Sequence, residues 1–239
     1  MYSFRRNRNL LLAAFPTAAL IISSGCSPAP AGGPTPTGSE MQGHFEQALE
    51  LQTGAILDDL DRVRAAGTRL RDALSITLLP PRSEIYERTL RAAASLAAAA
   101  RDGADARRAA AEVGATCGSC HRASNVRPSL VVGSPPSGTS LSSHMARQER
   151  ISRLLWVGMI GPSDQDWQDG AHELIDEPPF PSEIIGHVGD AQMLDDARAE
   201  LQSLGQEAAN AREQDRPELV ARVWSVCAGC HQAAGTSGY

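Results

Sequence analysis

The sequence predicts an all-α protein made of two tandem antiparallel four-helix bundles. Alanine is abundant, which favours helices, and no long run of Val, Ile, Thr and Tyr indicates strands. Apolar side chains recur at helical spacing in several segments. The string Cys-x-x-Cys-His occurs at residues 117–121 and 227–231, and each copy ends a set of four such segments. Helical sets of this kind are typical of bundles.

Four helices are expected in the first half of the chain. The first carries Phe45, Leu49 and Ile56 at helical spacing and ends at a short break at residues 58–59. Two prolines mark the stretch 75–83 as a connection, because proline interrupts a helix. The expected helices cover residues 41–57, 60–75, 83–100 and about 105 to the first string.

The second half repeats this order. Residues 161–164 read Gly-Pro-Ser-Asp, a turn with side chains that can cap a following helix. Pro217 suits the first turn of the last helix, where no backbone N–H donor is needed. A longer connection is expected over residues 177–189. The expected helices cover residues 143–159, 165–175, about 190–211 and about 217 to the second string.

Composition limits the class of function. The 239 residues permit one large domain or two smaller ones, and 42% hydrophobic residues are enough for packed cores. Lysine is absent and the formal net charge is −6. An acidic chain does not suit a polyanion, so no nucleic-acid partner is expected.

The repeated string has the residue types of a haem-attachment site. On a helix, residues i, i+3 and i+4 lie close together, so two cysteines and a histidine can address one flat group. Two thiols can add to the two vinyl groups of haem, and the adjacent histidine can ligate its iron. The sequence therefore predicts two covalently attached haem c groups. The expected attachment residues are Cys117, Cys120, Cys227 and Cys230, and the expected iron ligands beside them are His121 and His231.

Three other uses of the string compete with haem attachment. A disulfide within each cysteine pair is compatible with an oxidising compartment, but it leaves the histidine in both copies unexplained. A thioredoxin-like site needs a preceding strand, whereas the context here is helical. Zinc needs four ligands, and each string offers three.

The N-terminus is typical of an exported protein. A basic start with Arg5, Arg6 and Arg8 precedes an apolar stretch at residues 10–22, which is too short to span a bilayer. Cys26 then follows small residues, as at a bacterial lipoprotein cleavage site, and is the expected lipidation site. Pro, Gly, Ser and Thr dominate the residues after it, which favours a flexible tether.

These observations together predict the organisation of the chain. The expected parts are a signal peptide at 1–25, a tether at 26–40, a first haem-binding four-helix domain at 41–126, a linker at 127–141 and a second haem-binding four-helix domain at 142–239.

A four-helix segment that closes with Cys-x-x-Cys-His resembles cytochrome c-prime and its low-spin relatives. The resemblance covers residues 41–125 and 141–234. The family usually has a basic residue four positions after the histidine, where this chain has Asn125 and Gly235. This departure puts a transfer of the family's gas-binding behaviour in doubt.

The second axial ligand of each iron decides between electron transfer and gas binding. His44 and His144 each stand near the start of the first helix of their half, so both are expected as distal ligands. Met41 and Met145 are the rival ligands, because a thioether also binds haem iron. The other two histidines, His172 and His187, have no partners in the first half and are expected at the surface or in satisfied positions.

The sequence predicts an exported dihaem cytochrome c, lipid-anchored on the periplasmic side of a bacterial membrane. It would transfer single electrons between redox partner proteins and would not be an enzyme. The first alternative is a gas-binding or gas-sensing haem protein. A dihaem peroxidase is a weaker alternative, because each half is barely large enough to enclose one haem and no acid/base constellation stands out. A non-haem thiol or zinc protein is the third.

Overall fold

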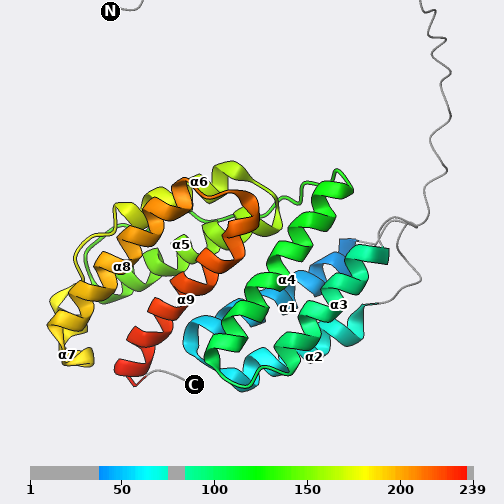
Figure 1. Cartoon of the computed structure of the whole chain (residues 1–239). Helices are drawn as coiled ribbons and strands as arrows, with labels where there is room; N and C mark the ends of the chain where they lie inside the picture. Colours follow the sequence, from blue (N-terminus) through cyan, green and yellow to red (C-terminus); the bar gives the residue numbers. More distant parts are fainter. Residues whose placement is uncertain (1–37, 75–83, 236–239) are drawn as a thin grey trace, which may run out of the picture. The chain divides into compact units, whose positions relative to one another are not determined.

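The computed structural model describes residues 38–74 and 84–235, and every regular element in these ranges is helical. This confirms the prediction of an all-α protein. Figure 1 shows the arrangement of the elements. They are α1 (Gly38–Leu57), α2 (Leu60–Ala73), α3 (Glu84–Ala98), α4 (Gly103–Ala123), α5 (Leu141–Ile160), α6 (Asp164–Ile175), α7 (Ser182–Val188), α8 (Ala191–Ala209), the 3-10 turn η2 (Glu213–Asp215) and α9 (Arg216–Ala233).

Polar side chains set where most of these helices begin. The side chains of Asp59, Asp102, Ser140, Ser163 and Asp190 each accept a hydrogen bond from a backbone N–H in the first turn of α2, α4, α5, α6 and α8. Such caps satisfy donors that the helix itself leaves unpaired. Eight of the observed helices begin and end within a few residues of the helices that the sequence predicts.

The prediction of one long connection over residues 177–189 is wrong, because α7 lies within it. Pro181 precedes this short helix, and Gly189 ends it in the left-handed conformation with φ of 76°. Its seven residues are too few to show the repeated apolar spacing on which the prediction of helices depended.

The helices contact each other in two series. In the first, α1 packs on α2, α2 on α3, α3 on α4, and α4 on α1. In the second, α5 packs on α6, α6 on α8, α8 on α9, and α9 on α5. The two series also meet, because α9 contacts α4 and α1, and α4 contacts α5 (Figure 1). One continuous apolar core consequently runs through both.

The turn between α1 and α2 has the same construction as the turn between α5 and α6. In both, the capping residue of the second helix donates its backbone N–H to a glycine carbonyl at 2.9 Å and caps the N–H three residues later. In both, that glycine lies against the first turns of the second helix with no room for a side chain. The matching residues are Gly54 and Gly158, Asp59 and Ser163, and Val63 and Trp167, each pair separated by 104 positions.

Several predicted features lie outside the described residues. These are the signal peptide at 1–25, Cys26 with most of its tether, and the connection at 75–83. Residues 127–140 contain no regular element, and Leu130 in this stretch packs against the core near Gly161. None of the helices in 38–74 and 84–235 combines the length and apolar character needed to cross a membrane.

Candidate functional site

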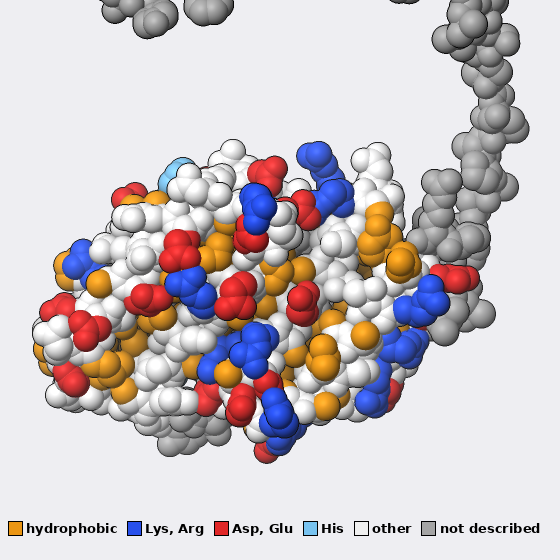
Figure 2. All heavy atoms as spheres, viewed as in Figure 1, with side chains coloured by type: hydrophobic (Ala, Val, Ile, Leu, Met, Phe, Trp, Pro, Cys, Tyr) orange, Lys and Arg blue, Asp and Glu red, His pale blue; other side chains and the backbone are white. Residues whose placement is uncertain are grey.

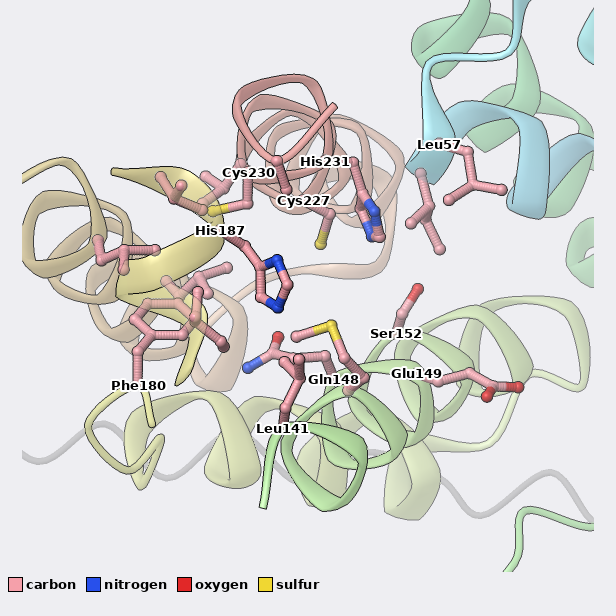
Figure 3. Close-up of a pocket in the computed structure, with 18 of the residues that line it drawn as sticks. Leu57, Leu141, Gln148, Glu149, Ser152, Phe180, His187, Cys227, Cys230 and His231 are labelled. Carbon is pink, nitrogen blue, oxygen red and sulfur yellow. The ribbon is translucent and has the colours of Figure 1, made fainter. Parts of the chain in front are cut away.

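The second string opens onto a large cavity. The cavity has a volume of about 710 Å³, and its walls come from α1, α5, α7, α8, α9 and the stretch before α7 (Figure 3). Apolar side chains such as Ile56, Leu141, Leu194 and Leu201 form much of the lining. Pockets that hold cofactors and other small molecules have volumes of roughly 300–1,000 Å³ and similar apolar linings.

Three residues of α9 present their side chains to this cavity. Cys227, Cys230 and His231 all line it, as the i, i+3 and i+4 spacing on a helix predicts. Burial raises the pKa of the Cys227 thiol to about 12 and also raises the pKa of Cys230. Burial lowers the pKa of His231, which favours its neutral imidazole. A neutral imidazole nitrogen is the form that binds metals.

A second histidine reaches the same cavity from another wall. His187 lies near the end of α7, and Figure 3 shows its ring in the cavity, facing the side where Cys227 and His231 lie. The residue is exposed, as expected, but it is exposed at the wall of this cavity. Ile184, one turn earlier, is 6% exposed and also lines the cavity. Because residues i and i+3 share a helix face, burial of Ile184 directs His187 to the same side.

His144 does not line this cavity. Its side chain is buried between Glu177, with 3.6 Å between Nδ1 and Oε1, and Phe180, with 4.7 Å between ring centroids. Burial lowers the pKa of His144 to about 4 and raises the pKa of Glu177 to about 7. At pH values between about 4 and 7 the imidazole is deprotonated and the carboxyl group is protonated, so both are neutral. In this pH range the contact is a buried neutral pair and not an ion pair.

The expected equivalence of His44 and His144 does not hold in the structure. The 104-residue spacing of the two turns continues through α1 and α5, which contain no insertion. It matches His44 with Gln148, which lines the cavity, and Met41 with Met145, which also lines it. His44 is half-buried and Met41 is exposed on α1. The helix ends, and not the histidines, define the equivalent positions.

The first string packs against the end of α5. The Nδ1 atom of His121 lies 2.8 Å from the backbone oxygen of Ile160. A carbonyl oxygen only accepts, so Nδ1–H donates, and Nε2 is the nitrogen that carries the lone pair when the ring is neutral. Metal-binding histidines commonly show this arrangement, because the hydrogen bond fixes the tautomer and the ring orientation. Burial raises the pKa of the nearby Cys117 thiol to about 12.

Glycine makes this close packing feasible. A Cβ atom on Gly118, between the two cysteines, would overlap the backbone oxygen of Met159. A Cβ atom on Gly114, one turn earlier, would overlap the ring of Trp156. The absence of both side chains allows α5 to approach α4 and places the Ile160 carbonyl beside His121.

The residues present fit a covalently bound haem. Cys117, Cys120, Cys227 and Cys230 are free thiols, as thioether formation requires. No group of three or more His, Cys, Asp or Glu side chains in 38–74 and 84–235 is placed to hold a metal ion. A haem iron needs only axial ligands from the protein, and the second cavity offers imidazoles from two walls.

The place of His187 in the cavity had only a weak signal in the sequence. The residue lies in a stretch expected to be a connection and has no histidine partner in the first half. The one signal is a possible helix start just before it. Residues 181–184 read Pro-Ser-Glu-Ile, in which a serine and an acid follow proline.

Comparison with known proteins adds no relative to this picture. No protein-family model matches the sequence, and neither the curated proteins nor the solved structures give a match. The resemblance to the cytochrome c-prime family therefore rests on the two strings and their helices alone.

Proposed function

We propose that the protein is a dihaem cytochrome c that transfers single electrons between redox partner proteins. Its two four-helix series would be tandem antiparallel bundles, each closed by a haem-attachment string. The observation that carries the proposal is the cavity of about 710 Å³, where Cys227, Cys230 and His231 meet a largely apolar lining and a second imidazole. A haem bound there would supply the one-electron chemistry of its iron.

The residues of the strings would hold the group in place. Each cysteine S–H can add across a vinyl C=C, so that sulfur bonds to one carbon and the hydrogen goes to the other. This addition needs no oxidant or reductant. His231 and His121 are the proposed proximal ligands, and the hydrogen bond from His121 to the Ile160 carbonyl holds its ring in the binding tautomer.

His44 is the proposed distal ligand at the first string. It occupies the position on α1 that Gln148 occupies on α5, and Gln148 lines the second cavity. α1 also packs on α4, which carries the first string. Figure 1 shows these two helices running in opposite directions, so the start of α1 and the end of α4 lie at the same end.

The surface suits transient encounters with partner proteins. Figure 2 shows acidic, basic and apolar side chains interspersed over the face in view. The net charge of −6 gives the chain an acidic balance, which would favour partners with basic docking surfaces. Complementary charge mainly accelerates encounter, which suits a protein that exchanges electrons with separate partners.

A redox titration of the purified chain tests the proposal. We expect reversible absorbance changes that account for two one-electron steps per chain, one for each string. A colourless protein, or one whose absorbance does not respond to reductant, would contradict it.

The proposed location is the periplasmic side of a bacterial membrane, through a lipid on Cys26. We expect the parent chain in the detergent phase and Cys26→Ser in the aqueous phase on phase partitioning. If Cys26→Ser distributes between the phases as the parent does, the lipid is not on this residue.

A further inference from the structure

α7 is held over the cavity from three directions. The Glu183 carboxylate at its start accepts a hydrogen bond from the backbone N–H of Leu141, with 2.9 Å between Oε2 and the nitrogen, which ties α7 to the start of α5. Ile184 is buried beneath it, and α7 also contacts α8 and α9. His187 is therefore carried by a fixed helix and not by a free connection.

The side chain of His187 enters the same cavity as the residues of the second string. Of the histidines in 38–74 and 84–235, His187 and His231 are the two that line this cavity, and they reach it from α7 and α9 (Figure 3). His144, one residue before Met145 on α5, points instead into the contact with Glu177 and Phe180.

We propose that His187 would complete, together with His231, the protein ligands of the iron that would be held at the second string. This rests on the proposed haem attachment and adds the identity of the distal residue. The two halves would then use different elements for the same task, α1 in the first half and α7 in the second. Met145 is the competing donor, because its side chain lines the same cavity.

The consequence of this assignment is spectroscopic. Two imidazoles give a low-spin iron whose axial positions are both filled, and removal of one opens a site for small gases. In His187→Ala, one of the two haems should become high-spin in the oxidised protein. The reduced variant should bind about one more carbon monoxide per chain than the parent.

The test uses the full chain with both haems attached. Oxidised spectra and carbon monoxide titrations would be recorded for the parent and for His187→Ala, with His172→Ala as the matched control, since His172 is exposed on α6 and does not line the cavity. The control should match the parent. Free imidazole added to His187→Ala should restore the low-spin spectrum, because it can fill the position that the side chain leaves. The variant should keep the helical circular dichroism of the parent, which a misfolded variant would not.

Several outcomes would overturn the assignment. It fails if His187→Ala keeps the spectrum and gas stoichiometry of the parent, or if Met145→Ala or His144→Ala produces the change instead. It also fails if the second haem of the parent is already high-spin. In the first two cases the covalent haems remain and the proposed function stands. A high-spin second haem in the parent would leave the covalent haems in place but would favour the gas-binding alternative over electron transfer. Only a chain without haem would remove both.

Discussion

The helices that carry the two strings differ in how closely they are packed. On α4, Gly114 and Gly118 allow Trp156 and the Met159 carbonyl to approach the backbone. Their counterparts on α9, which stand 110 positions later, are Trp224 and the buried Ala228. The first string therefore lies against the end of α5, whereas the second opens onto a large cavity.

This difference shows that two copies of one short string can have different surroundings. Each half also contributes groups to the surroundings of the other half's string. The end of α5 supplies the carbonyl that holds His121, and α1 supplies Gln52 and Ile56 to the cavity of the second string. A hydrogen bond from Gln52 to Ser152, at 3.0 Å, joins the halves nearby, and Ser152 also accepts from the Trp224 indole at 2.9 Å.

The largest expected difference between the halves comes from substituting His44 and Gln148, which occupy equivalent positions on α1 and α5. His44→Ala should convert the first haem to a high-spin, gas-binding state because it removes a proposed ligand. Gln148→Ala should leave both haems low-spin, because His187 and not α5 is proposed to fill the second site. Absorbance of the oxidised proteins measures both. Equal spectra for the two variants would contradict the assignment of different distal elements.

A smaller effect is expected from the glycines within the strings. Gly118→Ala places a Cβ where the Met159 oxygen lies and forces α4 and α5 apart, so it should lower the free energy of unfolding by about 1–3 kcal/mol. Gly229→Ala in the second string has open space around its Cβ and should be neutral or stabilising by up to about 1 kcal/mol. Chemical denaturation compares the two. A similar loss in both would mean that the overlap with the Met159 oxygen does not set the cost at Gly118.

The smallest expected effect is the loss of unfolding free energy when the matching helix caps of the two halves are removed. Asp59 and Ser163 cap α2 and α6 at matching positions, so Asp59→Ala and Ser163→Ala should each cost about 1 kcal/mol of unfolding free energy. Thermal unfolding gives both values. A difference much larger than the measurement error would show that the shared turn geometry does not carry a shared energetic role.

The helices could be predicted well from the sequence because their signals are local. Caps such as Ser140 and Asp190, and apolar residues at helical spacing, depend only on near neighbours. The choice between the candidate distal histidines of the second half depends on tertiary packing. His144 and His187 both lie within the second half, and only the docking of α7 on α9 and the burial of His144 against Glu177 distinguish them.

The equivalence of the halves was also hard to establish from sequence. A shift of four residues, from a spacing of 100 to one of 104, moves each side chain by about one helical turn and keeps it on nearly the same face. Periodicity alone therefore accepts His44 with His144 as readily as Met41 with Met145. The turn built on Gly54 and its counterpart at residue 158 resolves the choice, because its hydrogen bonds occur at one register only.

The intact mass of the mature protein after denaturation tests haem attachment most directly, because denaturation removes any group that is not covalently bound. Apart from the lipid proposed on Cys26, the parent should exceed its polypeptide mass by two haem groups. Cys117→Ser with Cys120→Ser should leave one, and Cys227→Ser with Cys230→Ser should also leave one. A parent mass with one haem or none would contradict the claim that both strings are attachment sites.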